Sequence, residues 1–367
     1  MPRAVGPRML LAVAILALAG GSAWALWSWT ARSGMATETA ALASAASLAA
    51  DRIRTQQEPA GYWLTAVTPG LAFERPTTEV NVFVPAVVVD LLDPIAEQTG
   101  LGPAVARARA WLTGQIEDTG LVRYHGNPGP GPPPTPGCEL PPDSDDTALV
   151  WRVAPRHETS LRDSARATIE GYRTDDGLYR VWLAPEDTHQ CFYRYSGREL
   201  NPADVAIQMH LHLFFAGYDP PAARRLCDAL GRRMTDDGIW VYYEVAPLIP
   251  RLREVDLALA GCPLRVPEAR LRDQPSGQEA YLQLAELRRR IVLDEDGAGA
   301  RAAALPLLAR LAADGFAAIV RTPPLVYHND LTATPPHYHW SADLGYALWL
   351  RAYADAIRRP GAAGARP

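Results

Sequence analysis

The amino-acid sequence predicts an all-α protein: an α/α toroid, or barrel, of about five to six helix pairs, preceded by one N-terminal transmembrane or signal helix. Three observations support this prediction. A glycine-centred turn returns at intervals of 57 to 77 residues along the chain. Amphipathic helical segments alternate with strongly apolar ones. No segment alternates polar and apolar residues for long enough to predict a sheet.

The N-terminus reads as a targeting segment. Arg3 and Arg8 precede an uncharged run from Met9 to Thr30, which is long enough to span a bilayer as a helix. Residues 1–30 are therefore predicted to be a cleaved signal peptide or a membrane anchor, with small residues at 23 and 25 offering a cleavage site. Either alternative predicts a membrane-anchored, secreted or periplasmic protein. We expect a linker at 31–37, the toroid at 38–357 and a disordered tail at 358–367.

Five amphipathic helices end in a similar turn. Each turn has a glycine where the C-terminal end of a helix favours a left-handed residue. An apolar or aromatic residue follows and can pack back under the helix end. The glycines are Gly61, Gly120, Gly177, Gly238 and Gly315.

The chain between these turns divides into two kinds of helix. The amphipathic ones are predicted to lie outside, and the stretch 277–293 has the same character. The more apolar ones are predicted to form a buried inner ring. We place the inner helices at about 80–95, 143–153, 202–216, 250–260 and 341–357.

Polar residues stand at the N-terminal ends of these inner helices. If the inner helices run in one direction, these side chains gather on one face and surround the mouth of a cavity. The set comprises Glu79, Asn81, Asp143, Asp145, Asp146, Asn201, Asp204, His337, His339, Ser341 and Asp343. His210 and His212 are two residues apart on one inner helix, so we expect only one of them, His210 or His212, to face the cavity.

Composition narrows the function classes. The net charge is −5 and no basic block is present, so a nucleic-acid partner is not expected. The aromatic residues are skewed toward 10 Trp and 14 Tyr against 6 Phe. Trp and Tyr combine an apolar face with a polar group, which suits a lined cavity, although large helical cores use them too.

The stretch Asp143-Ser144-Asp145-Asp146-Thr147-Ala148 is the most unusual local feature. Three carboxylates lie within four residues, directly before an apolar run that ends at Trp151. One interpretation is helix capping, since acids are favoured at an N-cap and in the first turn. The other is a Brønsted acid, because crowded and buried carboxyl groups hold a proton late. Both interpretations are open at this point.

The same stretch resembles the Asp-x-Asp-Asp-Thr-Ala signature of class II terpene cyclases, the squalene–hopene cyclases among them. Gln57, Gly61 and Trp63 are similar to the Gln/Trp repeat of that superfamily, and Asp236 to Trp240 looks like a degenerate copy. The resemblance covers roughly residues 38–357. Because only one toroidal domain fits in this length, it implies a single-domain member that is exported or membrane-anchored.

The resemblance implies an activity and a set of site residues. Asp145 would protonate an alkene of an isoprenoid, and Asp143 and Asp146 would tune and orient it. The product would be a cyclised or isomerised isoprenoid, and neither a cofactor nor a metal is expected. The partners would be an apolar small-molecule substrate and, through the N-terminal helix, a membrane. Cavity-lining residues would be Asn81, Trp151, Asn201, Asp204, His210, Trp240, Tyr242, His337, His339 and Trp340.

Two other functions stay open. A toroid can bind a lipid or envelope component without catalysis, and (α/α) barrels also include carbohydrate-active enzymes with paired carboxylates. The histidines around 328–339 are of metal-ligand type, but their spacing does not match a zinc site, and we predict that they line the mouth. Four cysteines in an exported chain permit disulfides; we favour pairing Cys138 with Cys191.

Overall fold

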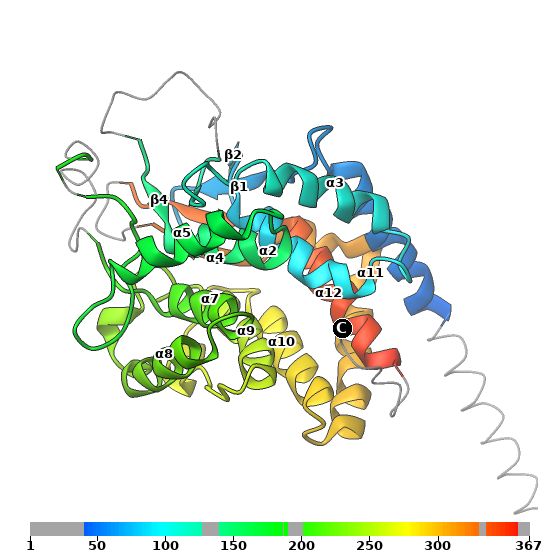
Figure 1. Cartoon of the computed structure of the whole chain (residues 1–367). Coiled ribbons are helices and arrows are strands. Elements are labelled where there is room, and N and C mark those ends of the chain that lie inside the picture. The colour runs from blue at the N-terminus through cyan, green and yellow to red at the C-terminus, as the bar shows by residue number, and fades with distance from the viewer. Residues whose placement is uncertain (1–39, 127–138, 186, 190–200, 330–334, 359–367) are drawn as a thin grey trace, which may run out of the picture. The chain divides into compact units, whose positions relative to one another are not determined.

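A computed structural model describes residues 40–126, 139–185, 187–189, 201–329 and 335–358 (Figure 1). The predicted signal or anchor helix, the linker and most of the predicted tail lie outside these residues. The chain divides into two compact units, residues 1–46 and 47–367. Residues 40–46 of the first unit are helical. The second unit, residues 47–367, is mostly helical, as the sequence predicts.

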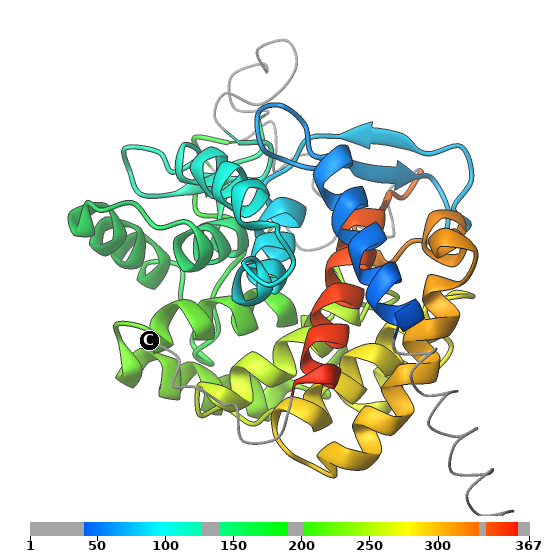
Figure 2. The same cartoon turned by 90° about the vertical axis from the view of Figure 1, so that its right-hand side faces the viewer.

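Six helices of this unit contact one another in a closed cycle. Along the chain, α2 contacts α4, α4 contacts α7, α7 contacts α9, α9 contacts α10 and α10 contacts α12. The last helix returns to the first, since α12 also contacts α2 (Figure 2). Their bounds are α2 (Phe83–Leu92), α4 (Ser144–Val153), α7 (Val205–Ala216), α9 (Leu248–Leu259), α10 (Glu279–Val292) and α12 (Ala342–Ile357).

These helices are buried over most of their length, and two of them, α2 and α7, are apolar on nearly every side. In α2 all but one of the residues are buried, and in α7 all but the last are. The prediction that 277–293 is an outer helix was wrong in position. Eight residues of α10 are buried, and two of them are arginines whose guanidinium groups are paired with carboxylates. Those arginines made a buried helix look amphipathic in the sequence.

Four further helices pack against this cycle. They are α3 (Gly102–Thr113), α5 (Thr159–Glu170), α8 (Pro220–Arg233) and α11 (Gly297–Arg321). Each contacts the cycle helix next to it in sequence: α3 contacts α2 and α4, α5 contacts α4, α8 contacts α7, and α11 contacts α10 and α12. In Figure 2 the red α12 runs beside the orange α11. Residues 47–56 are also helical.

The glycine turns join successive outer helices. Gly61 has φ 110°, and a Cβ there would lie 2.6 Å from the carbonyl oxygen of Arg107 in α3. At Gly120, with φ 83°, a Cβ would lie 2.0 Å from the carbonyl oxygen of Leu161 in α5. No other residue fits such a close approach of two backbones. Gln57 spans the first junction, donating to the carbonyl oxygens of Gly61 and Ala104.

Gly177 and Gly315 also have positive φ, as expected, but Gly238 does not. There the turn is a short 3₁₀ helix, η2 (Asp237–Ile239), whose N-cap Asp236 accepts a hydrogen bond from the Gly238 N–H. The capping aspartate stabilises a different turn, so the prediction of a left-handed glycine was wrong at this repeat. Two more 3₁₀ helices are η1 (Asp93–Ile95) and η3 (Glu268–Leu271).

The expectation of no sheet was also wrong. Strands β1 (Thr65–Thr68), β2 (Thr77–Glu79), β5 (Leu325–His328) and β6 (Tyr338–Trp340) form an antiparallel sheet in the order β2-β1-β6-β5. A second sheet pairs β3 (Val122–Arg123) with β4 (Pro142–Asp143). All strands have two to four residues, too few for a period of two to be recognised.

Two features bear on the predicted compartment. Cys227 of α8 forms a disulfide with Cys262, which follows α9. The pair favoured from sequence, Cys138 and Cys191, lies outside the described residues. By length and composition α11 could cross a membrane, but its backbone leaves the helical conformation at Ala313–Phe316, the position at which the sequence predicted a helix end.

Candidate functional site

The three aspartates of the acidic stretch lie together at the N-terminal end of α4. Asp143 is the N-cap, and its carboxylate accepts a 2.7 Å hydrogen bond from the Asp146 N–H. Its backbone belongs to β4, which pairs with Val122, and forms a bridge with Trp182. The stretch therefore caps the helix as one interpretation predicted. All three side chains are nevertheless buried, which capping alone does not require.

Asp145 faces away from the helix toward α7 and α9. One carboxyl oxygen, Oδ1, is hydrogen-bonded to Nδ1 of His210 on α7. The Tyr243 hydroxyl also bonds to this carboxyl group. Asp145 is the most exposed of the three acids, at 8% against 4% for Asp143 and 1% for Asp146. Its carboxyl group is therefore the least enclosed of the three.

His210 connects Asp145 to a network of charged residues. That one histidine of this helix faces a cavity stays a prediction. The Arg253 Nε–H donates to His210 Nε2 over 2.7 Å. Since Nε2 accepts, the proton of the neutral ring is on Nδ1, and His210 donates that proton to Asp145. His212 points elsewhere, with its Nδ1 3.0 Å from the carbonyl oxygen of Ala223.

Arg253 is buried beside two carboxylates, one from α2 and one from its own helix α9. Its Nη1 bonds to Asp90 in α2 and lies 3.4 Å from Asp256 in α9. Arg152 of α4 donates to the other oxygen of Asp90 over 3.1 Å and lies 3.7 Å from Asp256. We call Asp90, Arg152, Arg253 and Asp256 the arginine network. It links α2, α4 and α9 directly behind His210.

The electrostatics of the three aspartates favour bound protons. Burial raises the pKa of Asp145 to about 7, against the opposing effect of Arg253 and the Tyr243 hydrogen bond. Burial also raises the pKa of Asp143 to about 7. Burial and the adjacent Asp143 carboxylate hold the pKa of Asp146 well above its usual range. The last two side chains are hydrogen-bonded to each other, so Asp146 keeps the proton that they share.

Asp204 is the N-cap of α7, as Asp143 is the N-cap of α4. Its carboxylate accepts from the N–H groups of Ala206, Val241 and Tyr242, each at 2.9 Å. Burial still raises its pKa to about 7. Both carboxyl oxygens of Asp204 accept hydrogen bonds from backbone N–H groups. Asp204 therefore holds the 241–243 loop, which includes Tyr243, against the N-terminal end of α7.

A second polar cluster surrounds Glu79. Its carboxylate accepts hydrogen bonds from the Tyr124 hydroxyl and, over 3.2 Å, from the Asn81 amide. The Tyr124 and Tyr327 hydroxyls bond to each other, and His339 Nε2 lies 3.5 Å from Glu79. Burial raises the pKa of Tyr327 well above 10, and the charges of Glu79, Asp146 and Asp143 add to this effect. The predicted convergence of helix N-termini therefore includes α2, α4, α7 and the strands before α12.

The remaining predicted residues lie in other surroundings. The Trp151 indole donates to the carbonyl oxygen of Gly120, and the Trp240 indole to that of Met234, so both rings lie in the glycine turns and not beside the aspartates. Trp340 donates to Thr68 within the larger sheet. The Asn201 amide bonds to both backbone groups of Trp182, and His337 is exposed. Tyr242 contributes its backbone N–H to Asp204.

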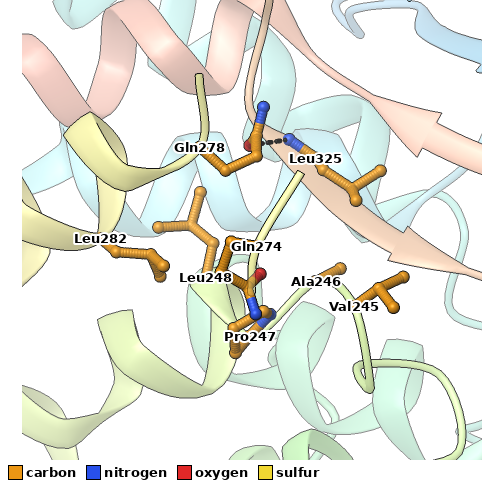
Figure 3. A pocket seen from close by; sticks show the side chains of 8 residues that line it. All are labelled: Val245, Ala246, Pro247, Leu248, Gln274, Gln278, Leu282 and Leu325. Carbon is orange, nitrogen blue, oxygen red and sulfur yellow. Dashed lines mark hydrogen bonds between the residues drawn. The ribbon is translucent and has the colours of Figure 1, made fainter. Parts of the chain in front are cut away.

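A pocket lies between the segment 245–248, the start of α10 and β5, all distant in sequence from the acidic stretch. It is lined by Val245, Ala246, Pro247, Leu248, Gln274, Gln278, Leu282 and Leu325 (Figure 3). None of the aspartates lines it. The Gln278 amide oxygen accepts from the Leu325 N–H at 2.8 Å, and its amide nitrogen donates to Pro323. Both polar groups of this side chain are therefore used in holding β5 to α10.

Within the part of the chain that the structure describes, no three His, Cys, Asp or Glu side chains are grouped as metal ligands. Asp187, His189 and Cys191 are a second set of metal-ligand type in the sequence, and Cys191 lies outside the described residues. His339 contacts Glu79, as described, and His328 Nδ1 lies 2.8 Å from the carbonyl oxygen of Asn329.

Sequence reasoning missed the arginine network. Asp90 stands in α2, which is otherwise apolar, and Arg253 stands in α9 together with Arg251, Glu254 and Asp256. A charged residue in such a helix is almost never buried without a partner. That rule points to Asp90 and Arg253 as a pair, although it does not reveal that His210 joins them.

Comparisons with known proteins give a fold and no function. No protein-family model matches this chain, and no curated protein is significantly similar to it. A crystal structure of a protein from Actinoplanes is similar, with a TM-score of 0.58 and 16% sequence identity over 86% of this chain and 100% of that chain. At this identity the likeness concerns the fold alone.

Proposed function

We propose that this chain is a terpene-cyclase-like α/α toroid that starts the isomerisation or cyclisation of an isoprenoid by protonating an alkene, with Asp145 as the general acid. The toroid is supported by the closed cycle of helix contacts from α2 to α12. If residues 1–30 are an export signal or anchor, as the sequence predicts, the reaction takes place at a membrane or beyond it, and an apolar substrate partitions into that membrane. The acid role is supported by the surroundings of Asp145.

Accessibility distinguishes Asp145 from its neighbours, and the proposal depends most on this observation. Asp143 and Asp146 bond to each other, and Asp146 is almost wholly buried. The Asp145 side chain has exposed surface and two polar partners, His210 and Tyr243. Of the three acids it is the most exposed, and its pKa is raised to about 7, as a general acid at neutral pH requires.

The two partners favour release of that proton. An alkene is a weak base, so the proton is transferred only if the carboxylate left on Asp145 is well stabilised. His210 Nδ1–H and the Tyr243 O–H both donate to the carboxyl group and strengthen as it becomes charged. Burial keeps the proton bound until the alkene arrives. The proton returns to Asp145 when the final carbocation loses one, so the reaction is neutral in protons.

The proposal is tested with the full-length chain purified in detergent and incubated with squalene and with short prenyl substrates. We expect a cyclised or isomerised product from the wild type and none from Asp145→Asn. Asp343→Asn is the matched control, because burial also raises the pKa of Asp343 to about 7 and this residue begins a cycle helix without touching Asp145. Equal product from wild type and Asp145→Asn, or none from any substrate, contradicts the proposal.

A further inference from the structure

We infer that Arg253 is a positioning residue that locks His210 in one protonation state, with a proton on Nδ1 only, and thereby keeps the acid proton on Asp145. The lock concerns the resting protein, and its catalytic meaning rests on the function proposed above. The inference starts from the hydrogen bonds on the two sides of one buried imidazole ring.

A carboxyl group and an imidazole in contact have two ways to share a proton. Either the carboxyl group keeps it and the ring is neutral, or the ring takes it and an ion pair forms. In the second state Asp145 is a carboxylate and cannot act as a general acid. An ordinary imidazole has a pKa near 6.5, above that of an ordinary carboxyl group, so His210 and Asp145 would favour the ion pair without further control.

Arg253 supplies that control through geometry. Its Nε–H points at His210 Nε2 over 2.7 Å, and a guanidinium is always charged and never an acceptor. A second proton on the ring would have to occupy Nε2, where it would face the Arg253 N–H. That state loses a hydrogen bond and sets two cations in contact inside the protein.

The groups around His210 act in both directions. Arg253 and Arg152 disfavour a charged ring, whereas Asp90 and Asp256 favour it. Burial and Arg253 have the largest effects, so the pKa of His210 lies well below its usual value. Phe83 of α2, with its ring centre 6.0 Å from that of His210, adds an apolar neighbour on another side. Asp145 completes the surroundings from α4.

The arginine network holds Arg253 in this orientation. Asp90 and Asp256 bind its Nη1 end, so its Nε end is left to face His210. Arg152 shares both carboxylates and balances their charge. The aspartates therefore orient the guanidinium, the guanidinium orients the imidazole, and the imidazole donates to the acid.

The test uses ¹⁵N-histidine NMR of the full-length protein without substrate, so it does not depend on finding the right isoprenoid. The chain has 8 histidines, and His210 is assigned by the signal lost in His210→Gln. In the wild type we expect a protonated Nδ1 and an unprotonated Nε2 throughout pH 6 to 8. A proton on Nε2, alone or together with one on Nδ1, overturns the inference.

The variant Arg253→Met removes the donor and keeps an unbranched side chain. We expect its His210 to gain a proton on Nε2 at pH 7 while Asp145 becomes a carboxylate, and product formation, where it is measurable, to be lost with it. Arg288→Met is the matched control: it removes another buried guanidinium, one that pairs with Asp355 and does not contact His210, so the wild-type ring state is expected. Identical ring states in Arg253→Met and the wild type contradict the lock. If Arg253→Met does not fold, the wild-type spectrum decides alone.

Discussion

Two groups of buried aspartates in this protein have opposite properties. Asp143, Asp145 and Asp146 at the N-terminal end of α4 have raised pKa values because burial meets little compensating charge. Asp90, near the C-terminal end of α2, has a side chain 13% exposed, close to the 12% of Asp145, but two guanidinium groups hold its pKa well below its usual range. Burial alone therefore does not decide which acid keeps a proton. The placement of arginines does.

A third buried site, in α12, also pairs an aspartate with two arginines. Asp355 of α12 accepts from Arg288 of α10 over 3.1 Å and from Arg351 over 3.0 Å. All three residues are buried, and no acid of the α4 stretch takes part. Arginine-paired aspartates thus lie within the cycle helices and join them, whereas proton-holding aspartates lie at helix N-termini on one face. His210 connects the two groups, because it is hydrogen-bonded both to Asp145 of the α4 stretch and to Arg253, which pairs with Asp90.

The largest expected effect comes from breaking an arginine-paired site. Asp355→Ala leaves two buried guanidinium groups without their carboxylate, which costs about 3–5 kcal/mol of folding free energy. Urea unfolding at pH 7 measures it. A loss below about 1 kcal/mol would mean that these ion pairs do not hold α10 against α12.

The pH dependence of stability sharpens the contrast. The acids of the α4 stretch bind protons in the folded protein that the unfolded chain has released above about pH 4, so they make stability fall as pH rises toward 7. Histidines with lowered pKa values, His210 and His339 among them, oppose this trend below about pH 6.5. Above that pH the acids act alone, and the Asp90 pKa is too low to contribute.

We therefore expect the free energy of unfolding to fall between about pH 6.5 and 8, with a slope of up to about 1.4 kcal/mol per pH unit for each acid still protonated. Urea unfolding across this range measures it. Asp146→Asn should flatten the slope above pH 7, because Asp146 holds its proton longest. Stability that rises from pH 6.5 to 8 would show that these acids are already ionised.

The smallest effect is expected from Asp146→Asn at pH 6. A protonated carboxyl group and an amide have similar shape and both can donate to Asp143, so stability should change by less than about 1 kcal/mol. The same measurement on Asp90→Asn provides the contrast, since Asp90 is ionised and its loss leaves Arg152 and Arg253 short of a partner. Equal losses in the two variants would remove the distinction between the two groups.

The sequence was informative where a repeat or an unusual cluster exists. The glycine turns located the helix ends, because Gly61 and Gly120 meet the backbone of a neighbouring helix and allow no side chain. The acidic stretch and His210 were identified from residue type and helix position. The sheet was missed because its strands are two to four residues long and pair segments such as β1 and β6, which are more than 250 residues apart.

The tertiary part of the site was beyond sequence reasoning. Trp151 and Trp240 were expected to line a cavity, yet their indole groups bond to backbone in the outer turns. A buried tryptophan needs an acceptor for its N–H, and the turn carbonyl groups supply one. Arg253 was missed because its partners Asp90 and His210 come from two other helices, α2 and α7, and only the contacts between the helices bring them together.

The protonation state of Asp145 at neutral pH is the central claim, and a carboxyl titration tests it most directly. The protein is labelled with ¹³C-aspartate, and the Asp145 signal is assigned by comparison with Asp145→Asn. We expect this carboxyl group to titrate near pH 7, with His210 neutral throughout. Titration near pH 4, the value of an ordinary aspartate, would contradict the account.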